Sequence, residues 1–528
     1  MTWAAIIFLN KSNTKTKETY GFKSTLEPKR IPEMKEFEDK LLELVENVEF
    51  RETKHHSGDF QRKLGETIGK IKSDENLYVK ADKTSNYHKM PREVYKQHMS
   101  ENIQKSYKKC AEVEVRKLVQ EEKRIATELG IEDRMYVAPK SDAYVQLKDH
   151  KTNYRNNPTF RLINTNKSEL GRVAKIKLQD INLQIRTKFH SNQWRNTQEV
   201  IAWFKSIQNK NRCHFLQFDI SEFYPSITEN LLRESINWAK EYTVITEEDK
   251  EVIFTASNSL LYENGKPWKK KNSENLFDIT MGSFHGAEVC ELVGLYLLYQ
   301  LKQINFNGGL YRDDGLGVCC GTKRQNENFK KEICEIFKKN NLKITVEVNL
   351  KVIDFLDITL DLERDLYKPY LKPNNTLLYV NRASNHPPNI LKNIPEGINK
   401  RLCAISKDED QFKESIPPYQ EALKSAGYKF KLNFEAPSEI PKQKRRQRKI
   451  IWYNPPFCKS VKTNLGAKFF KILQTCFPPS NPLHKIFNRN TVKLSYSCMS
   501  SIGKIISGHN IKIIKGEEAT PPLQLHPI

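Results

Sequence analysis

Hydrophobic and polar residues change their spacing several times along the chain, and each change predicts a different kind of element. Apolar residues at helical spacing predict an amphipathic helix over 37–50, with Phe37, Leu41, Leu44 and Val45 near one face. Between 213 and about 362 the pattern predicts strand, helix, hairpin, helix, hairpin and strand in that order. Such an order favours an α+β core in which helices pack behind an antiparallel sheet.

Individual stretches of this core have distinct signatures. The run "CHFLQFDI" predicts a buried strand, and 286–301 predicts a helix that is nearly all apolar. An Asn264-Gly265 pair between apolar residues predicts a two-residue hairpin turn. Beyond 380, Ile394, Ile398, Leu402 and Ile405 recur at helical spacing. The sequence therefore predicts a helical region after the core.

The net charge of the chain indicates what kind of partner the protein binds. The 528 residues contain 87 Lys and Arg against 64 Asp and Glu, a net charge of +23. This excess favours a polyanion such as nucleic acid, and a merely solvated basic surface is the alternative. Six of the nine residues in 441–449 are basic, including Lys444, Arg445, Arg446 and Arg448. This stretch predicts a phosphate-binding strap or a nuclear import signal, with a solvated loop as the alternative.

Cysteine usage and hydropathy exclude other classes. The ten cysteines contain no Cys-x-x-Cys pair and no zinc spacing, so we expect reduced, mostly buried thiols in an intracellular protein. The apolar opening "WAAIIFL" is only seven residues long, and no other apolar run approaches the length of a membrane span. We therefore expect no membrane association.

Carboxylates stand at unusual places in the predicted core. The strand "CHFLQFDI" ends near Asp219, and a buried carboxylate needs a partner or a metal. The stretch "GGLYRDDGLGVCC" contains Asp314-Gly315, a strong turn signal that would place Asp313 at a strand end and Asp314 in the turn. Alone, that motif favours an ordinary surface turn. Between the two stretches, Gly282 and Gly286 precede the apolar helix and would let another backbone or a nucleotide approach closely.

Together these features predict a metal-dependent site. Three converging carboxylates ionise cheaply only when cations lie among them, and hard oxygen ligands suit Mg²⁺ or Mn²⁺. Two such ions about 3.5–4 Å apart would activate an attacking hydroxyl and stabilise a leaving pyrophosphate. The sequence thus predicts two-metal nucleotidyl transfer.

The motifs "FDISEFYPSI", "MGSFHGAEVCEL" and "YRDDG" resemble, in that order, the signature motifs of reverse transcriptases. The stretch "PTFRLINTNKSELG" looks like the fingers segment of that family that holds the incoming triphosphate. Downstream, "NRASNHPPNILKNIPEGINKRL" is similar to the region after the polymerase core in Penelope-like retroelements and related families, so the resemblance runs from about Leu77 to Asn510. It implies a right-hand polymerase with fingers, palm and thumb. It also implies an RNA template, a DNA primer and deoxynucleoside triphosphates as partners.

Site residues follow from matching motif positions. The resemblance implies that Asp219, Asp313 and Asp314 are the catalytic, metal-binding carboxylates and that the Ile220 carbonyl is an extra metal ligand. It makes Tyr224 the aromatic that excludes a ribose 2′-OH, with a core aromatic as the alternative. Substrate-binding positions that it also implies are Gly282, Arg161 and, more weakly, Lys151. A solvated basic loop is the alternative for the two cations.

The chain also departs from the family pattern. Gly286-Ala287-Glu288 replaces a common Ser-Pro, Arg312 occupies a position that is usually small or apolar, and spacing leaves Lys343 and Lys351 open as the general acid. No GIY-YIG nuclease motif is present.

We expect an N-terminal helical extension at 1–75, fingers at 76–212, palm at 213–365 and a basic, thumb-like region with a C-terminal extension at 366–528. The predicted function is an RNA-directed DNA polymerase of a retroelement, in the nucleus; an RNA-templated RNA polymerase, which Tyr224 opposes, and a catalytically silent nucleic-acid-binding protein are the alternatives.

Overall fold

The protein is described here from a computed structural model. It describes residues 31–51, 59–135, 141–151, 153–165, 168–271, 273, 275–372, 375–436, 450–498 and 501–516. The basic stretch 441–449, with Lys444, Arg445, Arg446 and Arg448, lies outside the described residues. Its predicted role is therefore not tested by the structure.

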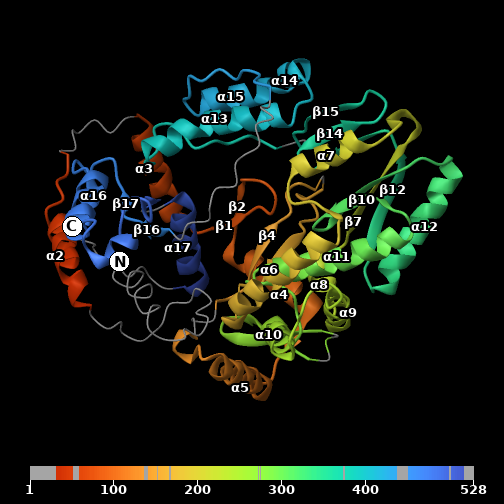
Figure 1. Cartoon of the computed structure of the whole chain (residues 1–528), viewed down its shortest axis with the longest axis horizontal. Helices are drawn as coiled ribbons and strands as arrows, with labels where there is room; N and C mark the ends of the chain where they lie inside the picture. Colours follow the sequence, from red (N-terminus) through yellow and green to blue (C-terminus); the bar gives the residue numbers. More distant parts are fainter. Residues whose placement is uncertain are drawn as a thin grey trace.

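A five-stranded sheet forms the centre of the larger part of the molecule, which lies on the right in Figure 1. Its strands, in spatial order, are β12 (Ile344–Leu350), β7 (His214–Ile220), β11 (Asp314–Cys319), β10 (Asn307–Tyr311) and β6 (Asn192–Gln193). The first four strands pair antiparallel, and β6 pairs parallel with β10. The predicted α+β class with an antiparallel sheet backed by helices is confirmed.

Alternation along β7 assigns its residues to two faces of the sheet. Leu216, Phe218 and Ile220 point into a large apolar core. The helices that contribute to this core are α5 (Glu112–Leu129), α6 (Leu170–Lys188), α9 (Glu229–Ala239), α10 (Glu247–Ser257), α11 (Gly286–Gln303) and α12 (Lys323–Lys339). The nearly all-apolar stretch beginning at Gly286 is α11, as its composition predicts. One face of the sheet is therefore fully covered.

The opposite face of the sheet is covered at only one end. Phe215, Leu316 and Val318 pack there against α7 (Thr197–Ser206) and against a second antiparallel sheet. That sheet consists of β13 (Val352–Phe355), β14 (Ile358–Asp361) and β15 (Leu366–Pro369). Asp219 is on the same face as Phe215 by alternation, but at the other end of β7, where its side chain is exposed. The covering layer thus stops short of the predicted carboxylates.

Two short hairpins precede the central sheet in the chain. One pairs β1 (Leu77–Lys80) with β2 (Tyr87–Met90), and the other pairs β4 (Tyr144–Leu147) with β5 (Phe160–Ile163). They are joined by a bridge from Ala81 to Leu147, and they share a small core with α4 (Arg92–Ser106). A third sheet combines β3 (Tyr107–Lys109), β9 (Lys266–Lys270) and β8 (Leu261–Glu263). The 76–212 stretch therefore supplies strands at the side of the central sheet.

Helices follow the second sheet, as their periodicity predicts. They are α13 (Pro388–Ala404), α14 (Glu409–Ser415) and α15 (Pro417–Ser425), at the top of Figure 1. Leu402 is buried in their shared core, and Ile394 and Ile398 pack against it. Ile405 lies beyond the end of α13 and joins the core beneath the central sheet instead.

The two ends of the described chain pack together. Helix α2 (Lys35–Glu46) contacts α16 (Leu465–Cys476), and α3 (Asp59–Lys72) contacts α17 (Ile502–Lys515). Figure 1 shows the red and blue helices side by side at the left. Two parallel strand pairs complete the unit, β16 (Ile451–Tyr453) with β18 (Val492–Leu494) and β17 (Pro456–Phe457) with β19 (Ser497–Cys498). We call residues 450–516 the C-terminal module.

The N-terminal helix corrects one detail of the sequence prediction. Phe37, Leu41 and Leu44 are buried against α16, as their spacing predicts. Val45 instead is 49% exposed, because the helix contacts one neighbour along a narrow stripe that ends at Leu44. Across the described ranges, no helix is both long and apolar enough to cross a bilayer.

Candidate active site

Register between β7 and β11 brings the predicted carboxylates together. Asp219 and Asp314 are directly opposed across the antiparallel pair, so both side chains project from the same face. Asp313 lies in the adjoining turn, and its backbone carbonyl accepts a hydrogen bond from the Ile220 N–H at 2.9 Å. Three carboxylates from two distant parts of the sequence thus meet at the open end of the sheet.

The turn itself differs from the predicted one. Tyr311 pairs with Asp314, so the two turn residues are Arg312 and Asp313, and Asp314 begins β11 instead of lying in the turn. Arg312 takes the left-handed conformation, with φ of 57°. Gly315 is needed for packing instead, because a Cβ there would collide with the ring of Phe218. The turn predicted at Asp314-Gly315 therefore lies two positions earlier in the chain.

Mutual repulsion and burial raise the proton affinity of two of these carboxyls. Burial, followed by the negative charges of Asp313 and Asp219, raises the pKa of Asp314 to about 6. Burial and the charge of Asp313 also raise the pKa of Asp219, while a hydrogen bond with Asp314 opposes the shift. The cluster therefore holds more negative charge than its own surroundings neutralise.

Cations from other parts of the chain face this cluster. Lys83, which follows β1, lowers the proton affinity of both Asp219 and Asp314, and Lys372 acts on Asp314. Neither was predicted from the sequence. Lys83 was missed because its approach depends on the bridge between Ala81 and Leu147, which only the folded chain brings together. Its basic, Tyr-containing neighbourhood was the one available signal.

A group of cations lies beside Lys83, near the turn between β4 and β5. Arg161, a predicted substrate residue, forms a 3.0 Å ion pair with Asp82, whose side chain is only 3% exposed. Burial and the charges of Arg161 and Lys151 lower the pKa of Lys148. Lys151, the weaker prediction, is exposed at the same turn. These three cations repel one another, and an anion placed among them would relieve that repulsion.

Tyr224 forms part of the wall beside the carboxylates. It lies on the short helix α8 (Phe223–Ser226) and is half-buried, and burial raises the pKa of its hydroxyl to about 12. The charges of Arg312 and Asp313 also act on it, so the ring is near the catalytic turn. A Cβ placed on Gly286 would contact the ring at 3.6 Å. Tyr224 is thus both packed and close to the carboxylates.

Gly282 has a packing role in the structure. A side chain there would collide with the backbone carbonyl of Asn164, just after β5. Of the two partners that the sequence allowed, a backbone and a nucleotide, the structure supplies the backbone. Gly286 is likewise enclosed. A Cβ placed on it would lie 2.7 Å from the Thr280 carbonyl oxygen and 2.6 Å from the Ser283 hydroxyl oxygen. The loop before α11 is therefore held tightly against the β4–β5 hairpin.

The two lysines left open by spacing lie at opposite ends of β7. The Lys343 carbonyl accepts a hydrogen bond from the Ser221 N–H at 2.8 Å, so Lys343, directly before β12, lies at the carboxylate end of β7. Lys351 donates to the carbonyls of Asn211 and Cys213, each at 2.8 Å, before β7 begins. The seven residues of β7 separate the two ends, about 23 Å. Lys351 is therefore too far away to serve the site.

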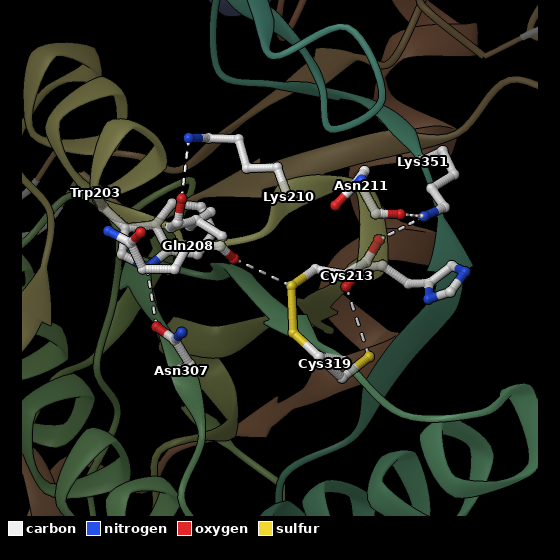
Figure 2. Close-up of a disulfide and its surroundings, with 11 residues drawn as sticks. Trp203, Gln208, Lys210, Asn211, Cys213, Asn307, Cys319 and Lys351 are labelled. Atoms are coloured by element: carbon white, nitrogen blue, oxygen red, sulfur yellow. Dashed lines mark hydrogen bonds between the residues drawn. A yellow bond between two sulfur atoms is a disulfide. The ribbon is translucent and has the colours of Figure 1, made fainter.

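A disulfide joins the same two strands at the end remote from the carboxylates. Cys213 pairs with Cys320, one residue beyond the His214–Cys319 register pair. Figure 2 shows the bond next to Lys351 and Cys319. The expectation that all ten cysteines are reduced thiols is wrong for these two, because the strand register places them opposite each other although 107 residues separate them. Of the remaining described cysteines, Cys290, Cys403 and Cys476 are buried.

The three carboxylates are candidate ligands for a metal ion. Among the described residues, no group of three His, Cys, Asp or Glu side chains is already arranged as a metal site. The chemistry of the donors nevertheless fits a hard divalent cation, because Asp219 and Asp314 share a hydrogen bond and carry raised pKa values that a cation would reverse. The Ile220 carbonyl follows Asp219 directly at this end of β7.

Comparisons with known proteins give remote structural likenesses only. No protein-family model matches the sequence, and no curated protein matches it. Telomerase from Candida albicans, solved with a fragment of telomeric RNA, has a TM-score of 0.44 at 10% identity; the match covers 70% of this chain and 65% of that chain. Apo telomerase from Candida tropicalis has a TM-score of 0.41 at 10% identity, covering 80% and 81%.

The RNA-dependent RNA polymerase of a human picorbirnavirus has a TM-score of 0.38 at 8% identity, and the match covers 79% of this chain and 92% of that chain. This chain thus spans 65% of the Candida albicans telomerase. All of these scores are below 0.5, and they add no argument about activity. The function is argued from the residues of this chain.

Proposed function

We propose that this protein is an RNA-directed DNA polymerase of a retroelement, which adds deoxynucleotides to a primer 3′-OH with the help of two Mg²⁺ or Mn²⁺ ions. The observation that carries the proposal is the opposition of Asp219 and Asp314 across β7 and β11, with Asp313 in the adjoining turn. Strand pairing gives these carboxylates a rigid common face. The cations around Lys83 and Arg161 provide the matching phosphate-binding side.

The carboxylates would hold the metal ions, with the Ile220 carbonyl as an additional ligand. Bound ions would supply charge neutralisation and would make the primer hydroxyl more acidic. The residues of the chain supply orientation. Asp219 is fixed on a strand between two neighbours, and Asp313 is held by its backbone bond to Ile220, so neither carboxylate must be ordered when substrate arrives.

The cations near the β4–β5 turn would bind the triphosphate. Arg161 presents a planar fork that suits bidentate contacts to phosphate oxygens, and the buried Asp82 carboxylate holds it in place. Lys148 and Lys83 add charge on the side facing Asp219 and Asp314. Lys343, at the carboxylate end of β12, is the candidate to protonate the departing pyrophosphate.

Tyr224 would select the sugar. Its half-buried ring lies beside the catalytic turn and is backed by α11, so it cannot easily move away from a 2′-hydroxyl. This favours deoxynucleotides over ribonucleotides by exclusion. It also opposes the alternative of an RNA-templated RNA polymerase, which must admit the 2′-hydroxyl.

A catalytically silent nucleic-acid-binding protein is the second candidate. The excess of basic residues alone would suit that function, and the basic stretch containing Lys444, Arg445, Arg446 and Arg448 could bind template or direct nuclear import. The retained carboxylate trio favours the enzyme, since three like charges at one strand end destabilise a fold that has no use for them.

Primer extension on a homopolymeric RNA template tests the proposal. With Mg²⁺ or Mn²⁺, the purified chain should extend a DNA primer, and Asp313→Asn should not. Binding of the primer–template should be nearly unchanged in the variant, because affinity comes mostly from Lys and Arg contacts to phosphate. Equal extension by Asp313→Asn and the unaltered chain would refute the assigned role, and binding without extension by the unaltered chain would favour the silent protein.

A further inference from the structure

The C-terminal module has an extreme charge composition. Residues 450–516 contain no aspartate and no glutamate, whereas a stretch of this length would carry about eight at the average frequency of the whole chain. The same stretch contains nine lysines and one arginine. Most of these cations are exposed, as at Lys468, Lys485, Arg489 and Lys504. The module is therefore positively charged without acidic residues of its own to compensate.

An aromatic side chain stands on the outer face of its small sheet. Tyr453 points inward, where its ring stacks on Phe469 with 4.1 Å between ring centroids. Trp452 alternates to the opposite side and is 53% exposed. An exposed indole offers a flat aromatic face on which a planar ligand can stack.

A cation lies directly beside that ring. In the parallel pair β16–β18, Trp452 is in register with Lys493, so the two residues project from neighbouring positions on the same sheet. The Lys493 ammonium donates to the Arg489 carbonyl at 2.6 Å, which keeps it close to Arg489. The Arg489 guanidinium lies over the Phe470 ring, 5.4 Å from its centroid. That guanidinium also donates to Gln474 Oε1 at 3.3 Å, so it points toward α16 on the inner side of the sheet, and Lys493 is the cation that shares the outer face with Trp452.

The module is attached to the rest of the chain by specific contacts. Asn510 on α17 binds the edge of β1, donating to the Tyr78 carbonyl at 3.0 Å and accepting from the Tyr78 N–H at 2.9 Å. Arg92 donates to the Ile514 carbonyl at 2.9 Å. Figure 1 shows α17, on the side of the module that faces the central sheet, next to β1. A ligand on the module is therefore held at a defined place relative to the catalytic strands.

We propose that the outer face of β16–β18 is a second binding surface, on which single-stranded RNA stacks a base against Trp452 while its phosphates contact Lys493 and other exposed lysines of the module. Stacking on an aromatic ring combined with a groove of cations is how proteins bind single strands without reading their sequence. A duplex would not fit, because its bases are already stacked within the helix. The choice of RNA rests on the proposed function, in which the unpaired template is RNA.

Binding measurements on the full chain test the surface. The chain carries Asp313→Asn throughout, so that no extension occurs, and the probe is a short, labelled oligouridine RNA followed by fluorescence anisotropy. Trp452→Ala should bind roughly 5- to 100-fold more weakly, whereas Trp452→Tyr should retain most of the affinity because it keeps a ring. Lys493→Gln should reduce the slope of log affinity against log salt by about 1.

Matched controls come from exposed positions outside the module. Val244→Ala removes an exposed apolar side chain, and Lys338→Gln removes an exposed cation on α12. Both variants should bind the RNA as tightly as the chain that carries Asp313→Asn alone, which is the parent in these measurements. In the parent, photocrosslinking with 5-iodouridine RNA should label the peptide that contains Trp452. A polyglutamate competitor should displace the RNA poorly, since it cannot stack.

Three results would overturn the proposal: parental affinity in Trp452→Ala, equal losses in Val244→Ala, or tighter binding of the matching DNA strand or of a duplex. Efficient displacement by polyglutamate would instead indicate an acidic protein partner and would also overturn it. Failure of the polymerase assignment is distinguishable. In that case the unaltered chain extends no primer, while the Trp452-dependent binding remains.

Discussion

Replacing Asp314 with asparagine should make the metal-free protein more stable while abolishing its activity. In the folded chain, burial and the charges of Asp313 and Asp219 raise the pKa of Asp314 from its ordinary value of 3.8 to about 6, while Lys83 and Lys372 oppose the shift. A raised carboxyl pKa means that the folded state binds a proton more tightly than the unfolded state. Stability contributed by this group is therefore lost as pH rises from about 4 to about 6 and then stays constant.

The size of the effect follows from that shift. A difference of about two pKa units corresponds to about 3 kcal/mol of destabilisation at pH values well above 6. The same relation leaves only about 0.5 kcal/mol near pH 4, where the folded-state carboxyl is almost fully protonated and the unfolded-state carboxyl is close to half protonated. Asparagine keeps the shape and removes the charge, so the variant should gain about 2–3 kcal/mol at about pH 7.5 and little near pH 4.

Thermal unfolding in the presence of EDTA and of Mg²⁺ measures this difference. Without metal, the midpoint of Asp314→Asn should exceed that of the parent at neutral pH, and the gap should close on acidification. Mg²⁺ should raise the midpoint of the parent more than that of the variant, because a bound ion neutralises the cluster. Asp180→Asn, which removes an exposed carboxylate in the middle of α6, is the matched control.

Two outcomes would refute the reasoning. If Asp314→Asn is no more stable than the parent in EDTA at neutral pH, the three carboxylates do not repel one another as their register implies. If Mg²⁺ stabilises both proteins equally, the ion does not bind at this cluster. Either result would leave the two-metal proposal without its structural basis.

Three further changes test neighbouring features. Tyr224→Ala should increase ribonucleotide incorporation relative to deoxynucleotide, read as the ratio of the two kcat/KM values, and an unchanged ratio would make Tyr224 a packing residue only. Gly282→Ala should lower the unfolding midpoint, because its methyl group meets the Asn164 carbonyl; an unaltered midpoint would contradict that contact. Cys320→Ser should destabilise the oxidised protein by about 2–4 kcal/mol. If the unaltered chain has the same unfolding midpoint when the Cys213–Cys320 bond is intact and when it is reduced, the bond contributes nothing to stability.

The sequence predicted helices and turns correctly where residues close together in the chain determine the structure. The apolar stretch 286–301 forms helix α11, and the turn at Asn264 and Gly265 forms with φ of 49° and 71°, as their preference for the left-handed region predicts. The same Asp-Gly logic was wrong at Asp314, because Gly315 is required by the ring of Phe218 from another strand. Contacts between strands override turn preference there.

The candidate site was predictable only in part, for the same physical reason. Asp219, Asp313 and Asp314 stand in motifs, so their meeting could be expected from motif order. Lys83 reaches them through a bridge between distant strands, and Cys213 meets Cys320 through strand register, so neither follows from spacing along the chain. Tertiary pairing decides such contacts.

Templated synthesis is the most direct test of the central claim. The purified chain is given a heteropolymeric RNA template, an annealed DNA primer, all four deoxynucleotides and Mg²⁺, and the products are sequenced. The account predicts DNA complementary to the RNA up to its 5′ end, with no product from Asp219→Asn. Products unrelated to the template, or complementary DNA made equally by Asp219→Asn, would contradict it.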